Sequence, residues 1–151
     1  MVNESEFDEL CRVIGLAILM SQKLQFALAH YHAFCKMTNM SMSKVDAEKL
    51  IEKLLSKTLG GVVSAVKSET PLGQSLTEKL DALLKERNWL AHDFDIEATP
   101  VIAAGGEFGH FTERMKEISR NTHAVMVELD EIGITMATNR STPTVNTGAA
   151  R

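Results

Sequence analysis

A single charged residue interrupts the most regular apolar stripe in the second half of the chain. The stripe advances in steps of three and four residues, as one face of an α-helix does, and reads Leu76, Leu80, Leu83, Arg87, Leu90 and Phe94. Arg87 therefore occupies a position at which the periodicity predicts another apolar residue. Because an unpaired charge in a protein interior is costly, Arg87 must either be paired or line a site.

The composition favours an all-α fold. The chain has 151 residues, of which 44% are hydrophobic and only 5% aromatic, and Leu, Ala, Met, Lys and Glu are abundant. This length suits one domain with a sizeable core. We expect a single antiparallel up-down bundle of four to five helices over residues 1–138, followed by a flexible C-terminal tail, residues 139–151.

Capping and helix-breaking residues set the expected boundaries. Ser5 is the expected first N-cap, the glycines at 60 and 61 predict a break or kink followed by a helical turn or two, and Pro100 is expected to end a helix. Residues 101–109 are expected to form a loop. The first expected helix begins at residue 5 and ends somewhere between residues 34 and 38. The other expected helices are residues 46–57, 74–95 and 107–137.

The first expected helix carries two apolar stripes, which indicates that it is covered from two sides. In a chain this small, we expect a second subunit to supply the second cover. The stripes are Phe7, Leu10, Ile14, Ala17, Leu24, Leu28 and Tyr31, and Val13, Leu16, Met20, Ala27 and Phe34.

Charge and cysteine placement indicate a cytoplasmic protein without a membrane segment. The N-terminus is acidic, unlike a signal peptide, and the apolar run Val13 to Met20 is too short to span a bilayer. Cys11 and Cys35 are 24 residues apart, a separation of about 36 Å on one helix, so they cannot pair.

No acidic residue lies between Leu10 and Val45. This stretch is either an ordinary solvated face or a weak polyanion-facing surface.

Three polar side chains around the interrupted stripe can converge on one spot. Arg87 offers a permanent cation with a bidentate fork for phosphate, Asn88 an amide, and His92 a group that titrates near neutrality. This set suits phosphodiester cleavage by internal attack, in which a ribose 2′-hydroxyl loses a proton and the leaving oxygen gains one. One histidine cannot easily perform both transfers, so a symmetric dimer would complete the site.

Other interpretations of the same residues remain open. Arg87 could form a buried ion pair with a carboxylate of the last helix, such as Glu117 or Glu128, and His92 could simply cap a helix C-terminus. Trp89 fits a core or interface position better than a base-stacking platform. His30 and His32 lie on different helix faces, unlike a metal pair, and we expect neither a metal nor a cofactor.

The segment Arg87-Asn88-Trp89-Leu90-Ala91-His92 resembles the R-x4-6-H signature of HEPN domains, and Thr58-Leu59-Gly60 and His92-Asp93-Phe94 extend the likeness to bacterial members. HEPN domains are helical bundles, commonly dimeric, and many are metal-independent ribonucleases. The resemblance implies that Arg87 and His92 are catalytic and that Asn88 supports them.

The leading hypothesis is therefore a homodimeric endoribonuclease that leaves a 2′,3′-cyclic phosphate and acts in a toxin–antitoxin or phage-defence role, with RNA as substrate and an antitoxin protein as a candidate partner. The competing hypothesis is a non-catalytic HEPN-like interaction or regulatory module that binds a partner protein or a nucleotide.

Overall fold

The computed structural model describes residues 3–141, which form six α-helices and no strand. The all-α expectation is therefore confirmed for this part of the chain, while the number of helices exceeds the four or five expected. The helices are α1 (Glu4–Asn39), α2 (Lys44–Leu55), α3 (Leu59–Glu69), α4 (Gln74–His92), α5 (Phe94–Ala103) and α6 (Gly109–Ser141).

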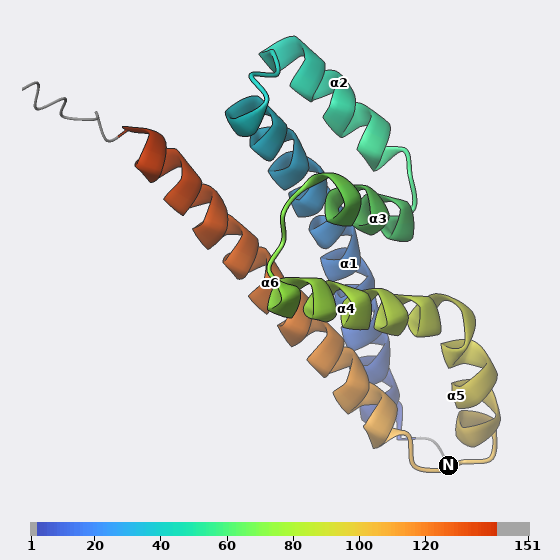
Figure 1. Cartoon of the computed structure of the whole chain (residues 1–151). Helices are drawn as coiled ribbons and strands as arrows, with labels where there is room; N and C mark the ends of the chain where they lie inside the picture. Colours follow the sequence, from blue (N-terminus) through green and yellow to red (C-terminus); the bar gives the residue numbers. More distant parts are fainter. Residues whose placement is uncertain (1–2, 142–151) are drawn as a thin grey trace, which may run out of the picture.

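The two longest helices, α1 and α6, pack side by side at the centre of the fold and run in the same direction (Figure 1). The first part of α1 packs against the first part of α6, since Leu10 and Phe111 share one core cluster. The later parts of the two helices also pack together, since Leu28 and Leu129 share the other cluster. The remaining helices lie to one side of this pair, with α4 crossing it steeply (Figure 1). This arrangement differs from a simple antiparallel up-down bundle, in which each helix reverses the one before it.

The core consists of two clusters arranged along α1. The larger one gathers the second half of α1 with α2, α3, the first half of α4 and the later part of α6, and includes Leu28, Val66 and Leu80. The smaller one joins the first half of α1 to the end of α4, to α5 and to the start of α6, and includes Val13 and Met115. Arg87 lies in sequence between members of the two clusters.

Side-chain caps explain where the first three helices begin. Asn3 caps α1 by accepting a hydrogen bond from the backbone of Ser5, so the N-cap is Asn3 and not Ser5 as expected. Ser43 caps α2, and Thr58 caps α3 by accepting from the backbone N–H of Gly61 at 3.2 Å. The break that was expected at the paired glycines lies just before them, at residues 56–58, and both glycines belong to the first turn of α3, which continues to Glu69.

The segment after the motif departs from the sequence-based prediction. Instead of one helix to residue 95, α4 ends at His92 and α5 begins at Phe94. The break turns Phe94 toward Trp89, with their ring centroids 5.6 Å apart. Pro100 lies inside α5 and does not end it, although its nitrogen cannot donate the helical hydrogen bond to the carbonyl of Ile96. Gly105, with φ of 68°, closes the helix end.

The last helix is longer than expected and includes residues 139–141, which the sequence placed in a tail. The rest of that predicted tail, residues 142–151, lies outside the described residues.

A buried histidine ties α1 to the end of α3. His32 is 1% exposed. Its Nδ1 lies 2.7 Å from the Thr70 hydroxyl and its Nε2 lies 3.1 Å from a carboxylate oxygen of Glu69. Because a carboxylate only accepts, Nε2 carries the proton and Thr70 donates to Nδ1. Lys36 completes the cluster with an ion pair to Glu69.

The length and composition of α1 would also allow it to cross a membrane. An 18-residue window in this helix has a mean hydropathy of 1.3, and 33% of that window is buried inside the fold. The central helix of a helical bundle meets the same criteria, and Leu24 and Leu28 are in fact buried in the larger core cluster. The expectation that the protein has no membrane segment stays a prediction.

One side of α1 carries exposed apolar side chains that no other helix covers. Leu19 is 46% exposed and Phe26 is 54% exposed, and Leu16 and Ile18 are exposed beside them. We call these four residues the α1 apolar face. Exposed apolar side chains on one side of a helix are candidates for an interaction surface.

Candidate functional site

Arg87 lies at the junction between the two core clusters. Leu83, one turn earlier on α4, is buried in the larger cluster, and Leu90, one turn later, packs against the smaller one. The apolar stripe is thus continuous on both sides of Arg87 but belongs to two cores. The half-buried Arg87 side chain fills neither of them and lines a cavity instead.

The cavity has a volume of about 230 Å³ and lies between α1, the start of α3 and the end of α4. We call it the Arg87 cavity. Its walls are aliphatic on several sides, and its polar groups come from α1 and from Arg87. The lining residues are Ile18, Ser21, Gln22, Gln25, Leu59, Arg87, Leu90 and Ala91.

Local hydrogen bonds hold much of this wall in place. Gln25 donates from Nε2 to the backbone carbonyl of Lys57 at 2.6 Å, which fixes α1 against the α2–α3 connection. Ser21 donates to the carbonyl of Ala17 at 2.9 Å. Leu59 follows directly after the N-cap Thr58 and is buried. The cavity is therefore a preformed feature of the packing of three helices.

No carboxylate of the described residues 3–141 lines the Arg87 cavity, although acidic residues surround the motif in the sequence. Glu86 points toward α6 and accepts two hydrogen bonds from Arg114, at 2.8 and 3.0 Å. Asp95 accepts from the hydroxyl of Thr99 at 2.8 Å. Glu86 and Asp95 are thus engaged elsewhere, and Arg87 is the one charged residue among the described residues that line the cavity.

The structure brings together two of the three predicted site residues. Arg87 donates from Nη1 to the Oδ1 of Asn88 at 3.5 Å. Asn88 itself faces another surface depression, which it lines together with Trp89, Asp93 and Arg114. Asn88 can therefore orient the guanidinium from outside the cavity but does not enter it.

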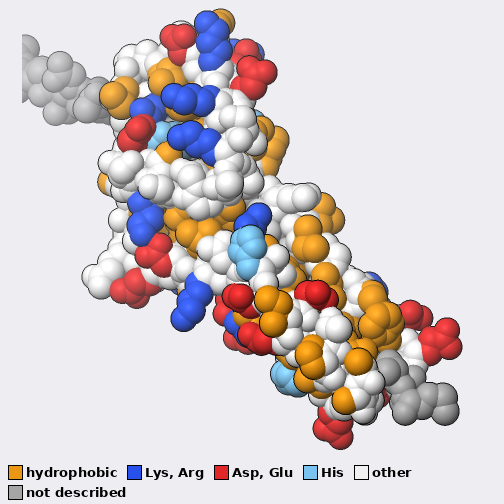
Figure 2. Space-filling view, turned by 90° about the vertical axis from the view of Figure 1, so that its right-hand side faces the viewer, with side chains coloured by type: hydrophobic (Ala, Val, Ile, Leu, Met, Phe, Trp, Pro, Cys, Tyr) orange, Lys and Arg blue, Asp and Glu red, His pale blue; other side chains and the backbone are white. Residues whose placement is uncertain are grey.

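His92 is the last residue of α4 and is exposed. It lines none of the cavities described here, and it forms no side-chain hydrogen bond or ion pair within residues 3–141. It therefore does not cap the carbonyls of α4 through its side chain. Within one chain, Arg87 and His92 lie about 140° apart around the helix axis, as expected for a spacing of five residues. Figure 2 shows the side of the molecule on which α4 ends, where many hydrophobic side chains reach the surface.

The structure also answers the alternative explanations for Arg87 and Trp89. Arg87 forms no ion pair within residues 3–141, so neither Glu117 nor Glu128 neutralises it there, and Glu128 pairs with Lys79 at 2.8 Å. Trp89 is 7% exposed and belongs to the smaller core cluster, as expected for a core residue. The guanidinium of Arg114 lies 3.4 Å from the centre of its ring.

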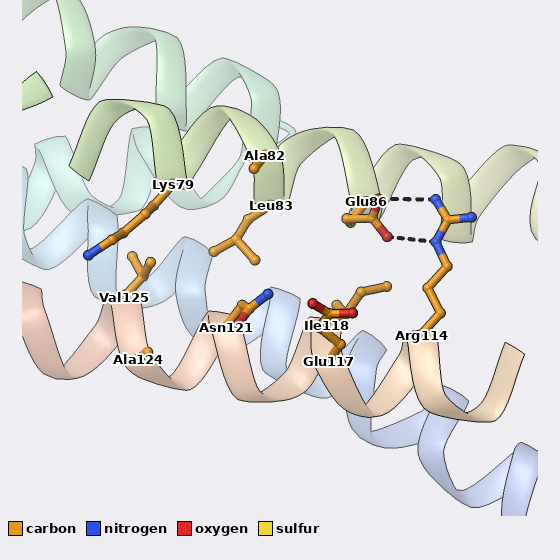
Figure 3. Close-up of a pocket in the computed structure, with 10 residues that line it drawn as sticks. All are labelled: Lys79, Ala82, Leu83, Glu86, Arg114, Glu117, Ile118, Asn121, Ala124 and Val125. Carbon is orange, nitrogen blue, oxygen red and sulfur yellow. Dashed lines mark hydrogen bonds and ion pairs between the residues drawn. The ribbon is translucent and has the colours of Figure 1, made fainter. Parts of the chain in front are cut away.

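A larger groove of about 530 Å³ lies between α4 and α6 (Figure 3). Leu83 points from α4 toward Ile118 and Val125 on α6 and forms an apolar floor (Figure 3). Ion pairs of Lys79 with Glu128 and of Arg114 with Glu86 close its two ends. The groove contains neither Arg87 nor His92, and its cations are already paired, so it is poorly suited to bind a phosphate.

Sequence reasoning missed the α1 side of the cavity. Gln22 and Gln25 are ordinary polar residues between apolar ones, and their spacing carries no recognisable motif. The one available signal was the break of the Arg87 stripe, which indicated a site but not its second wall. His32 was also missed as a buried residue, because its partner Glu69 is 37 residues away in the chain.

The chain matches no known family model, no curated protein and no solved structure. Within residues 3–141, no group of three or more His, Cys, Asp or Glu side chains is placed to hold a metal ion. Cys11 and Cys35 are both free thiols, the first exposed and the second buried.

Proposed function

We propose that the protein is an endoribonuclease of HEPN type that acts as a homodimer and cleaves RNA without a metal ion. The observation that carries this proposal is the guanidinium of Arg87, which has no ion-pair partner within residues 3–141 and lines a cavity free of carboxylates. A cation left unpaired at a half-buried position is available for a phosphate.

The chemistry follows from the two groups at the end of α4. The ribose 2′-hydroxyl attacks the adjacent phosphorus while a base removes its proton, and the bond to the 5′-oxygen breaks as an acid protonates that oxygen. The products are a 2′,3′-cyclic phosphate and a 5′-hydroxyl. His92 supplies one proton transfer, and Arg87 stabilises the negative charge that builds up on the phosphate oxygens.

The second proton transfer requires a second histidine, which a second copy of the chain would supply. The α1 apolar face supports this dimer, because it is exposed in one chain and adjoins the Arg87 cavity through Ile18. In the dimer, two copies of Arg87 and His92 would flank one cleft. If the protein belongs to a toxin–antitoxin system, an antitoxin would act by covering this cleft.

A second function has one observation in its favour. Arg87 and His92 line no common cavity in a single chain, as would be expected of a non-catalytic HEPN-like module that uses Arg87 to bind a partner protein or a nucleotide. The two proposals differ in what wild-type protein does to RNA.

The test uses purified full-length protein, EDTA and a single-stranded RNA of mixed sequence, with 2′-O-methyl RNA of the same sequence as the control. The enzyme proposal predicts cleavage of the RNA alone, with cyclic phosphate ends detected by mass spectrometry. Cleavage of both substrates, or of neither, contradicts it, and intact RNA bound through Arg87 would favour the non-catalytic module.

A further inference from the structure

The Arg87 cavity contains a polar group that the proposed chemistry does not use. Gln22 is exposed at the mouth of the cavity, and its amide forms no hydrogen bond within residues 3–141. The other polar groups on the α1 wall differ, because Ser21 donates to Ala17 and Gln25 donates to Lys57. Gln22 therefore keeps both amide hydrogens for a ligand and Arg87 keeps all but one of its N–H donors, while Gln25 keeps only the second hydrogen of its amide.

The size of the cavity argues for one unit of a polymer. At about 230 Å³, it is smaller than the roughly 300 to 1,000 Å³ typical of pockets for whole small ligands. Its aliphatic walls, from Ile18, Leu59 and Leu90, suit the faces of a flat ring. A sugar fits less well, because each of its hydroxyl groups would need a hydrogen-bond partner that these walls lack.

We propose that the Arg87 cavity binds one base of single-stranded RNA, with Gln22 as the residue that determines base preference and Arg87 holding the neighbouring phosphate. The proposal rests on the proposed function for its choice of RNA as ligand. Unstacked bases whose edges are read by hydrogen bonds are the usual basis of sequence-specific RNA recognition.

The chemistry of the amide favours adenine. A glutamine side chain presents a donor beside an acceptor, and it pairs with the amino group and ring nitrogen of adenine through two hydrogen bonds. Adenine offers such a donor beside an acceptor on both of its exposed edges, so it can pair in either orientation. The other three bases offer a donor beside an acceptor on the Watson–Crick edge alone, and the second exposed edge of guanine presents two acceptors, which do not match the amide.

The test measures binding separately from cleavage. The probes are four fluorescent 2′-O-methyl RNA pentamers that differ only in their central base, and internal attack cannot cleave them. Wild-type protein is expected to bind the adenine probe at least about 5-fold more tightly than the guanine probe, the lower end of the discrimination of one bidentate pair. Gln22→Ala should bring the four dissociation constants together, whereas Asn121→Ala, which removes an exposed amide in the α4–α6 groove, should leave the preference unchanged.

The outcomes separate this proposal from the enzyme proposal. Equal affinities for all four probes, or an adenine preference that survives in a folded Gln22→Ala variant, would overturn the base-binding role of Gln22. Cleavage of all-ribose RNA by wild type would still support the enzyme in that case. Conversely, a Gln22-dependent preference without any cleavage would uphold the base site and reject the nuclease.

Discussion

Arg87 donates a single 3.5 Å hydrogen bond to the side chain of its neighbour Asn88, and it forms no ion pair within residues 3–141. The comparable cation Arg114, on α6, is engaged by two hydrogen bonds to Glu86 and a stacked contact on Trp89. The two arginines therefore differ in the partners that they have within the fold. Arg114 joins α4 to α6, and Arg87 remains available for a ligand.

The role of Trp89 in joining these helices predicts a large loss of stability on truncation. Trp89→Ala should lower the free energy of unfolding by about 3–5 kcal/mol, because it leaves a cavity among Phe94, Phe111 and Arg114. Trp89→Phe should cost clearly less, since the indole N–H that it removes has no partner within residues 3–141. Urea unfolding followed by far-ultraviolet circular dichroism measures both, because Trp89 is the only tryptophan in the chain. Equal losses for the two variants would contradict this packing role.

The buried His32 predicts that stability falls in mild acid. Burial lowers the pKa of His32 below its ordinary value of 6.5, and this effect outweighs the opposing influence of Glu69. Because the unfolded chain then binds a proton more readily than the folded one, stability is complete above the ordinary pKa and declines as the pH falls below it. Melting temperatures between pH 8 and pH 5 should show this decline in wild type. They should show a weaker decline in His32→Gln, with the exposed His123→Gln behaving as wild type.

The α1 apolar face predicts that a charge placed on it prevents dimer formation. Leu19→Lys should weaken the dimer by about 30-fold or more, the effect of losing one interface hot spot. Val45→Lys is the matched control, because Val45 is 60% exposed but lies on α2. Sedimentation equilibrium over a range of concentrations measures both variants. A wild-type protein that stays monomeric, or a Leu19→Lys variant that dimerises normally, would argue against this interface.

Local sequence signals predicted much of the fold. Helical periodicity identified core positions of α4, such as Leu76 and Leu80, which are buried, and the expected start of the second helix at residue 46 lies two residues after the observed start at Lys44. The end of α4 at His92 was missed because it depends on Phe94 contacting Trp89 and Phe111, a tertiary preference that no local pattern encodes. The directions of α1 and α6 were missed for the same reason.

The candidate site was predicted from one side only. The interrupted stripe predicted that Arg87 is either paired or lines a site, and Arg87 lines a cavity whose function stays a prediction. The other wall depends on which face of α1 packs against α4 and α3, so Gln22 and Gln25 could be recognised only in three dimensions. The roles of Arg87, Asn88 and His92 in catalysis stay predictions.

The most direct test of the central claim is RNA cleavage in EDTA by the single variants Arg87→Ala and His92→Ala. Each should lower the cleavage rate by at least about 100-fold, as expected for the loss of a proton-transfer group or of a cation at the phosphate. Circular dichroism and sedimentation should show that both variants stay folded and dimeric. Lys85→Ala, which removes an exposed cation on the same helix, should retain wild-type activity. Cleavage at the wild-type rate by the Arg87→Ala/His92→Ala double variant would contradict the account.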